Sequence, residues 1–357
     1  MALLLEHLLF ELTNVCNARC PHCYIVGVSE DCFLDAASVK RSLKDAAAIG
    51  ARRISLTGGE PLLHPDFLDI VKFARRKRFY ITVTTNGSLL TEELVNSLAE
   101  VGAITLRITI QSHIPEKHDE FFKIPGLFNR ILKISKYILE TGILEIGWNT
   151  NILKTNFMDT NKLMELAENL GIPLFHNNNL FHRRDGDSSP TSFMLNEEDW
   201  RRFYASFKSD TQDSTGDLKD ERRRHFSAEA TEKIAARKGA TCNVGLFSLS
   251  VLNNGNVVPC LNWHNRVLGN INEHSIKDIW LENPFLKELQ SLKGEEFAKC
   301  LNCPFKANCY KCPAANERAT GDFRAPKDDY CAFVEAVNSA AKEIKYLRHL
   351  DPALDDD

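Results

Sequence analysis

Three cysteines close to the N-terminus, Cys16, Cys20 and Cys23, have the spacing C-x3-C-x2-C. A random scatter of eleven cysteines over 357 residues would give this spacing in only about one chain in a hundred. Three thiolates on one short loop suit a [4Fe–4S] cluster, which normally takes four ligands. Zinc sites more often use two close pairs, with histidines at set spacings nearby. The missing fourth ligand would leave one iron open to a small molecule, as catalytic metal sites require.

A second group of cysteines fills the last third of the chain, and no cysteine lies between Cys32 and the first of them. Its members are Cys242, Cys260, Cys300, Cys303, Cys309, Cys312 and Cys331. Their two C-x2-C pairs could bind zinc in a ribbon, but two all-cysteine zinc sites would need eight thiolates. The gap between the groups predicts two domains. We interpret Cys32, which belongs to neither group, as a small packed side chain in preference to a catalytic one.

Short β-branched or aromatic runs alternate with amphipathic helical stretches from residue 7 to about residue 176. The predicted strands are Leu8–Thr13, Arg53–Thr57, Phe79–Thr84, Ala103–Ile110, Leu144–Leu153 and Ile172–His176. The predicted helices are 36–49, 66–77, 91–101, 126–141 and 159–170, with N-caps at Asp35 and Thr91 and stops at Gly50, Gly102, Gly142 and Gly171. Such alternation predicts a parallel sheet with right-handed crossovers, two units short of an eight-unit barrel.

Polar motifs follow the ends of the predicted strands. The cysteine loop follows the first strand, and Gly58-Gly59-Glu60-Pro61 follows the second. The remaining motifs are Thr85-Asn86-Gly87, Gln111-Ser112-His113 and Asn177-Asn178-Asn179, after the third, fourth and sixth strands. In a parallel barrel these motifs share the rim on which active sites form. Polar residues in loops are ordinary, but this concentration of Gly, Cys and Asn at matched positions is not.

The cysteine loop and the glycine-rich turn together resemble the radical SAM superfamily. In that family the loop is C-x3-C-x-φ-C, with His22 at the φ position here and Tyr24 after the last cysteine. The resemblance implies that S-adenosylmethionine (SAM) chelates the open iron and yields a 5′-deoxyadenosyl radical that abstracts hydrogen from a substrate. It also implies cofactor contacts from a set of rim residues, namely Tyr24, Gly58, Gly59, Glu60, Pro61, Asn86, Thr109, Gln111 and Asn149.

Two further segments carry the same resemblance. Thr109–Asp119 is similar to the family's fourth-strand segment, with Thr109 and Gln111 where Ser and Asp are common. Asn149–Asn156 is similar to its fifth-strand segment. The alternative interpretation of the cysteine loop is a structural metal site.

The C-terminal cysteines resemble a SPASM domain, including Gly255 before Cys260, although the spacing Cys309-x2-Cys312 is one residue shorter than usual. The resemblance implies two auxiliary [4Fe–4S] clusters, and so three clusters in all. The outer cluster would be held by Cys300, Cys303, Cys309 and Cys331, and the inner one by Cys242, Cys260 and Cys312. With three cysteine ligands, the fourth iron of the inner cluster is expected to be open or to take a non-cysteine ligand. Cys32 is the less favoured candidate for that fourth ligand. Trp263, His264 and Trp280 are expected to pack this small domain.

Bulk composition restricts the partners. A net charge of −4 gives no electrostatic reason to expect nucleic acid, and no apolar run approaches the roughly 20 residues that span a bilayer. The apolar Met1–Leu5 lacks a basic n-region and a cleavage site, so we expect a cytoplasmic protein with no membrane partner. Its reductant would be a flavodoxin or ferredoxin. The Glu221–Arg224 run is interpreted as a solvated helical face, and the tail Asp351–Asp357 as disordered.

The sequence thus predicts an α/β fold, a partial (β/α)6 barrel of the TIM type followed by a small iron–sulfur domain. The expected divisions are a barrel over 1–195, a hydrophilic linker over 196–240 with a helix near 197–208, a SPASM domain over 241–335, and a helix with an acidic tail over 336–357. The last helix is expected at about 332–347.

The resemblance favours a peptide maturase that oxidises or cross-links a ribosomally made precursor, through a carbon–carbon or thioether bond. Many such enzymes begin with a winged-helix recognition domain, which has no room before the first strand here. Recognition would then need a separate partner protein or another surface of this chain. The alternatives are oxidation or epimerisation of a small molecule such as an aminosugar, Cys or Ser oxidation in a sulfatase-type target, and a non-enzymatic electron carrier. His113, His176 and Gln111 are rim candidates for an acid or base, and none is assigned as catalytic.

Overall fold

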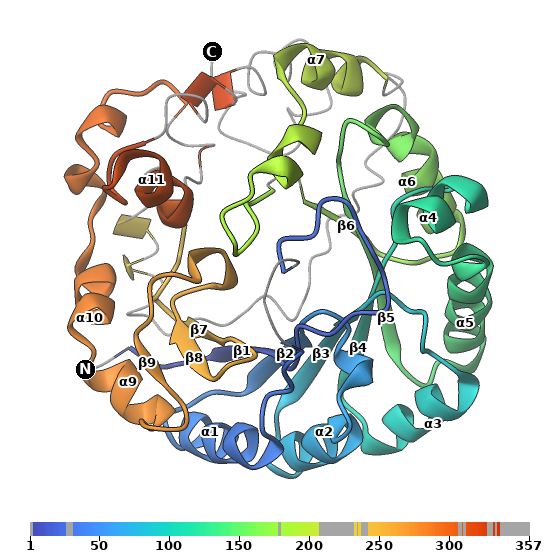
Figure 1. The fold of residues 1–357 in the computed structure, drawn as a ribbon, viewed down its shortest axis with the longest axis horizontal. Helices are drawn as coiled ribbons and strands as arrows, with labels where there is room; N and C mark the ends of the chain where they lie inside the picture. Colours follow the sequence, from blue (N-terminus) through green and yellow to red (C-terminus); the bar gives the residue numbers. More distant parts are fainter. Residues whose placement is uncertain are drawn as a thin grey trace.

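The computed structural model describes residues 3–25, 31–177, 180–206, 242–305 and 312–326, with 232–233, 235–236, 309, 331–332 and 334–335. Its centre is a curved sheet with helices on the outer side (Figure 1). Helices from both halves of the chain follow the same outer arc, α1 to α6 along one side and α9 to α11 along the other (Figure 1).

Six parallel strands form the predicted partial barrel. They are β1 (His7–Glu11), β2 (Arg53–Thr57), β3 (Tyr80–Thr85), β4 (Ile104–Thr109), β5 (Glu145–Asn151) and β6 (Leu174–Asn177). Each pairs in parallel with the next, so the sheet order follows the chain order. The fold class is therefore confirmed, and each observed strand overlaps the segment predicted for it.

The crossover helices also lie where the periodicity placed them. They are α1 (Ala36–Ala48), α2 (Phe67–Arg76), α3 (Glu92–Val101), α5 (Leu127–Thr141) and α6 (Thr160–Asn169). Asp35 and Thr91 cap α1 and α3 by accepting from the backbone N–H groups of Ser38 and Leu94. Gly102 and Gly142, both at positive φ, end α3 and α5. The sequence analysis missed α4 (Pro115–Phe122), which fits two turns of helix between β4 and α5.

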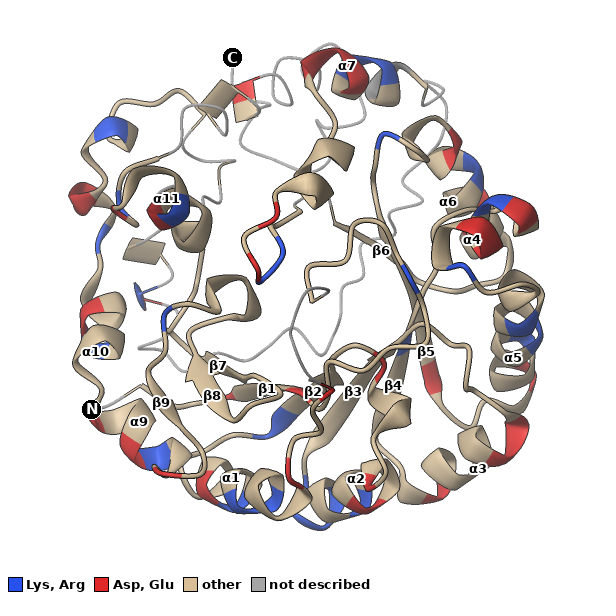
Figure 2. Ribbon diagram, viewed as in Figure 1, with Lys and Arg blue, Asp and Glu red and all other residues tan. Residues whose placement is uncertain are grey.

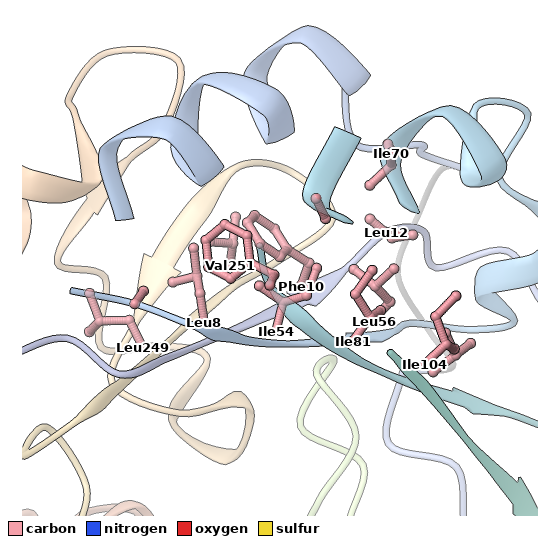
Figure 3. Packing of buried hydrophobic residues seen from close by; sticks show 14 of the residues in the cluster. Leu8, Phe10, Leu12, Ile54, Leu56, Ile70, Ile81, Ile104, Leu249 and Val251 are labelled. Atoms are coloured by element: carbon pink, nitrogen blue, oxygen red, sulfur yellow. The ribbon is translucent and has the colours of Figure 1, made fainter. Parts of the chain in front are cut away.

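Side chains alternate along each strand between the helices and the barrel interior. Leu8, Phe10 and Leu56 are fully buried, and Figure 3 shows them between the strands and the surrounding helices, beside Ile70 of α2. Alternation then directs His7 and Glu11 of β1 toward the interior. The apolar outer face thus holds the barrel together, while the inner face remains free for polar groups.

The C-terminal domain continues the barrel's own sheet, which the sequence did not predict. β7 (Ser248–Val251) pairs in parallel with β1, and β8 (Asn256–Val258) and β9 (Gly269–Asn270) follow in antiparallel order. Within the described residues the result is one nine-stranded sheet, and Leu249 and Val251 pack in the same core as Leu8 and Phe10 (Figure 3). The domain is completed by α9 (Ile276–Glu282), α10 (Pro284–Ser291) and α11 (Pro313–Thr320).

The contact between the two halves is apolar, with specific hydrogen bonds. Trp280 of α9 is 2% exposed, and its Nε1 donates to the carbonyl oxygen of Leu3 at 2.6 Å. Trp280 and Trp263 therefore pack the C-terminal domain as expected, and Trp280 also fastens it to the start of the chain.

Short 3-10 turns connect several of the elements. They are η1 (Pro61–Leu63), η2 (Phe157–Asp159), η3 (Ser189–Phe193), η4 (Leu261–Trp263), η5 (Gly294–Glu296) and η6 (Ala298–Cys300). The helix expected near 197–208 is α7 (Glu197–Ala205). The Glu221–Arg224 run, most of the helix expected at 332–347 and the acidic tail lie outside the described residues. The domain boundaries remain a prediction. No helix among the described residues is long and apolar enough to cross a membrane.

The shared sheet predicts that both halves unfold together. Leu249 is fully buried on β7, so Leu249→Ala should lower the free energy of unfolding by about 2–5 kcal/mol through the cavity that it leaves. Chemical denaturation followed by far-ultraviolet circular dichroism should show one transition, shifted as a whole. Two transitions, with only one of them shifted, would contradict a common core.

Candidate functional site

The glycine-rich turn after β2 packs directly on the backbone of the cysteine loop. A Cβ on Gly58 would stand 2.3 Å from the carbonyl oxygen of Thr13, and one on Gly59 would stand 2.2 Å from that of Val15. The Gly59 N–H donates to Thr13 O at 2.7 Å, and the Glu60 N–H donates to Val15 O at 2.8 Å. These contacts exclude any side chain at the two glycines, and they fix the start of the cysteine loop against the turn.

The Glu60 side chain fastens this turn to the end of β3. It is fully buried, with Oε1 accepting from Thr85 Oγ1 at 2.7 Å and from the Leu62 N–H at 3.1 Å. Oε2 accepts from the Asn86 N–H at 2.8 Å. Burial raises the pKa of Glu60 to about 7, against the opposing effect of these bonds. Because the protein engages both side-chain oxygens and the Gly59 and Glu60 N–H groups, the carbonyl oxygens of Gly58 and Gly59 are the part of this turn left for a ligand.

Asn86 connects β3 to the cysteine loop. Its side chain is buried, and Nδ2 donates to Asn17 Oδ1 at 2.9 Å and lies 3.9 Å from Cys16 Sγ. Asn86 thus stands beside the first cysteine, as the rim argument expected. Pro61 begins η1 directly after Glu60 and is also buried.

The three thiols of the loop lie within electrostatic reach of one another. Burial raises the pKa of Cys20, and the neighbouring Cys23 and Cys16 raise it further. Burial also raises the pKa of Cys16, although the Ala18 N–H donates to its Sγ at 3.4 Å. Deprotonating all three thiols without a partner would cost free energy, because the neighbouring thiolates repel one another. A cationic centre bound by all three thiolates would offset that cost. Within the described residues no three His, Cys, Asp or Glu side chains close around one ion-sized point, and a four-iron cube holds its thiolates further apart.

His22 leaves one buried hydrogen-bond donor beside the cysteines. Asn151 Nδ2 donates to His22 Nε2 at 2.9 Å, and Asn151 Oδ1 in turn accepts from Asn177 Nδ2 at 3.4 Å. The ring proton therefore belongs on Nδ1, which is buried without a partner among the described residues. Burial lowers the pKa of His22 to about 4, so the ring is neutral at pH 7. An unmatched donor of this kind fits an acceptor atom on a bound ligand, such as SAM.

The predicted residues of β4 and β5 fall into two environments. Thr109 and Asn149 are register partners on neighbouring strands, so their side chains stand side by side on the inner face. Gln111 is instead 2% exposed. Its backbone N–H donates to His118 Nδ1 at 3.2 Å, and its backbone carbonyl oxygen accepts from Asn156 Nδ2 at 3.0 Å. Gln111 therefore shapes the β4 rim from within a polar network, which spacing could not distinguish from ligand contact.

The two candidate histidines also differ. His176 of β6 shares register with Thr150, on the face opposite Asn149 and Asn151. His176 therefore does not join the inner-face group. His113 follows β4 in a half-buried position, and burial lowers its pKa.

The inner group of C-terminal cysteines comes together around two helix starts. Cys242 and Cys312 both raise the pKa of Cys260, after the larger effect of burial. Cys260 precedes η4 and Cys312 precedes α11, and backbone N–H groups of each helix point at the sulfur. Helix N-termini stabilise negative charge, so the three residues suit an anionic cluster.

The cysteines predicted for the outer cluster, and Cys32, have fewer described contacts. Cys300 and Cys303 share one turn, in which the Cys303 N–H donates to Cys300 O at 3.3 Å. Cys309 is buried and Cys331 is exposed, and their assignment to the outer cluster remains a prediction. Cys32 is half-buried, with Sγ 3.3 Å from the carbonyl oxygen of Asn253.

Sequence profiles identify both halves. The profile described as the radical SAM superfamily matches residues 10–168, and the SPASM profile, described as an iron–sulfur cluster-binding domain, matches residues 242–304. This chain is a radical SAM enzyme with a C-terminal SPASM domain. SAM and [4Fe–4S] binding follow from this membership, and the cysteine loop, the glycine-rich turn and the unmatched His22 donor fit them.

Individual relatives have different activities. The chain is 29% identical to the AdoMet-dependent heme synthase of Methanosarcina barkeri, over 91% of this chain and 95% of that protein. It is 26% identical to the subtilosin biosynthesis protein AlbA of Bacillus subtilis, over 86% of the chain and 66% of AlbA. The crystal structure of Streptococcus suis SuiB bound to its precursor peptide SuiA has a TM-score of 0.69 at 18% identity, covering 93% of this chain and 76% of SuiB.

The close backbone packing makes Gly59 a sharp test of the site. Gly59→Ala places a methyl group against Val15 O, so the cysteine loop must move, and reconstituted iron bound by that loop should fall by more than half. The matched control is Gly171→Ala, at positive φ but with nothing within 4 Å of the added methyl group, which should leave iron binding intact. Equal iron content in the two variants would refute the packing argument.

The unmatched donor of His22 gives a second prediction. His22→Phe keeps a ring of similar size but removes the donor, so SAM binding to the reconstituted protein should weaken by roughly tenfold, the value of one hydrogen bond to a charged ligand. Because burial keeps the ring neutral, wild-type SAM affinity should show no step attributable to this histidine between pH 5.5 and 8, about the range in which free histidine titrates. Isothermal titration under anaerobic conditions measures both effects.

Proposed function

We propose that this radical SAM/SPASM enzyme oxidatively modifies or cross-links a ribosomally made peptide. The observation that carries the proposal is the shared sheet. Because β7 pairs with β1, the strand that leads into the cysteine loop lies beside the first strand of the domain that contains Cys260. In this proposal both cysteine groups border the same barrel interior. A substrate in that interior would have a radical source on one side and an electron acceptor on the other. The similarity to AlbA and to the SuiB–SuiA complex supports a peptide as that substrate.

The protein's own residues would bind the first cluster, orient SAM and shield both from water. We propose that Cys16, Cys20 and Cys23 hold the first cluster, while the backbone at Gly58–Glu60 and the side chains of Asn86, Thr109 and Asn149 receive SAM. Tyr24 and Pro61 would support this site, and Gln111 would do so through its buried network. When bound, SAM and the reduced cluster supply the 5′-deoxyadenosyl radical that removes hydrogen from the substrate.

The C-terminal domain would supply two auxiliary clusters. In this proposal Cys242, Cys260 and Cys312 hold the inner one, which keeps an open or non-cysteine site, and Cys300, Cys303, Cys309 and Cys331 hold the outer one. The proposal also includes a flavodoxin or ferredoxin as reductant, a separate peptide-recognition protein, and a reducing cytoplasmic setting, in which clustered cysteines serve as metal ligands more often than as disulfides.

A tetrapyrrole is the second candidate substrate. The heme synthase relative matches this chain over nearly the whole length of both proteins, at slightly higher identity than AlbA does. The barrel interior and the inner cysteine group would serve that substrate in the same way. The peptide and tetrapyrrole proposals therefore differ only in which substrate the enzyme converts.

Substrate conversion decides between them. The reconstituted enzyme, with SAM and a reductant, is incubated with short peptides encoded beside its gene and, separately, with a panel of iron porphyrins. The peptide proposal expects a peptide that loses a pair of hydrogen atoms by mass spectrometry, with SAM consumed in proportion. Conversion of a porphyrin with every peptide unchanged would overturn it in favour of the second candidate.

Metal content tests the number of clusters. Anaerobic reconstitution should give about twelve irons per chain, and a Cys16/Cys20/Cys23→Ala triple variant should give about eight, as expected for three [4Fe–4S] clusters. About four irons in the wild type, together with zinc, would mean that the C-terminal domain is a structural zinc fold. The radical chemistry would then remain, without an auxiliary electron path.

A further inference from the structure

A charged segment between β6 and η3 enters the centre of the molecule. Figure 1 shows the chain after β6 (yellow-green) turning inside the ring of elements, and Figure 2 shows that its tip is charged. The turn is held by its own bonds: the Arg183 N–H donates to Asp187 O at 2.8 Å, and the two side chains form an ion pair at 2.9 Å. Arg184 is therefore presented on a tight turn, not on a loose loop.

Arg184 is the point where four separate parts of the chain meet. Its Nη2 donates to both carboxylate oxygens of Glu11, at the end of β1. Its Nη1 donates to Asn253 Oδ1 at 3.2 Å, in the turn between β7 and β8. Its backbone N–H donates to the carbonyl oxygen of Tyr24 at 3.1 Å, directly after the last cysteine of the loop.

Tyr24 is held from its side chain as well. Its hydroxyl donates to Glu11 Oε1 at 3.1 Å, and the Arg184 guanidinium lies 5.7 Å from the centre of its ring. The residue that follows Cys23 is thus fixed by backbone and side chain to the same ion pair. On its other side the cysteine loop is fixed by the Gly58–Gly59 turn, so the two contacts clamp it from both ends.

The ion pair between Arg184 and Glu11 is buried. The side chains of Arg184 and Glu11 are 10% and 1% exposed. Removing one partner of such a pair leaves a buried charge uncompensated, which disturbs a site much more than breaking a surface pair does. The guanidinium directs Nη2 at the carboxylate and Nη1 at Asn253 within one rigid plane, and an ammonium cannot hold two donors at that fixed separation.

We propose that Arg184 is a positioning residue that sets the cysteine loop, and through it the SAM site, relative to the C-terminal domain. It acts through Glu11 and Tyr24 on the loop and through Asn253 on the β7–β8 turn. Loss of these two directed donors releases the C-terminal side of the loop, so the three thiolates and the glycine-rich turn no longer present SAM with one fixed geometry.

The test uses the reconstituted holoprotein without any substrate. SAM affinity and the SAM-induced change in the electron paramagnetic resonance spectrum of the reduced N-terminal cluster are measured, with the Cys16/Cys20/Cys23→Ala variant subtracting the auxiliary signals. Arg184→Gln is expected to weaken SAM binding by roughly tenfold or more and to diminish the spectral change. Arg184→Lys, which keeps the charge but not the two separate donors for Glu11 and Asn253, is expected to fall between that variant and the wild type.

A double variant and a matched control separate positioning from stability. Glu11→Gln with Arg184→Gln leaves no buried charge and permits amide–amide bonding, so it should recover part of the SAM affinity and remain measurable if Arg184→Gln alone fails to fold. Arg266→Gln breaks a half-buried pair with Glu317 inside the C-terminal domain. It should lower the melting temperature while leaving SAM affinity and the spectrum unchanged.

Two outcomes overturn the proposal. One is an Arg184→Gln protein that is destabilised as Arg266→Gln is, yet binds SAM with wild-type affinity and spectrum. The other is an Arg184→Lys protein indistinguishable from the wild type. The inference rests on the proposed SAM site but not on the substrate, so a wild type that binds SAM and converts no peptide leaves it standing. A wild type that shows no SAM response refutes the site itself.

Discussion

The contact between two backbones is the constraint on which the site depends. The turn after β2 approaches the cysteine loop so closely that only Gly58 and Gly59 fit, and two backbone hydrogen bonds join the segments. Glu60 then fastens the same turn to β3 through Thr85 and Asn86. Three consecutive strands thereby converge on one small region, and the cysteines are held by main-chain geometry instead of by flexible side chains.

The polar groups of the interior are supported by an apolar exterior. Alternation along the strands sends Leu8 and Phe10 into the core beneath the helices and leaves Glu11 facing inward. A buried carboxylate needs a partner, and Arg184 reaches it from a segment more than 170 residues away. The cost of burying that charge is offset by contacts that also hold Tyr24, so core packing and site geometry are parts of one arrangement.

The sheet itself connects the two functional halves. Since β7 pairs with β1, the C-terminal domain directly contacts the strand that leads into the cysteine loop. Trp280 reinforces this connection through Leu3. A rigid shared sheet suits chemistry in which a reactive species must meet its target before water does, because orientation and exclusion of solvent are the protein's contribution.

The sequence alone determined the fold class, the strand positions of the barrel, its helix positions apart from α4, and the identity of the cysteine loop. Local patterns carry that information: strand and helix periods, capping residues, and a cysteine spacing too improbable to be accidental. It also placed Asn86 and the glycine turn at the rim, because carboxyl ends of parallel strands must meet there.

Only the tertiary structure decided which side chains face the interior and which distant segments meet. It enclosed Gln111 in a hydrogen-bond network and put His176 in register with Thr150, away from the inner-face residues, where spacing had made both equal candidates. It also joined β7 to β1 and brought Arg184 to Glu11. Those outcomes depend on pairings between residues far apart in the chain, and no local pattern encodes such pairings because their free energy arises only when the whole sheet is assembled.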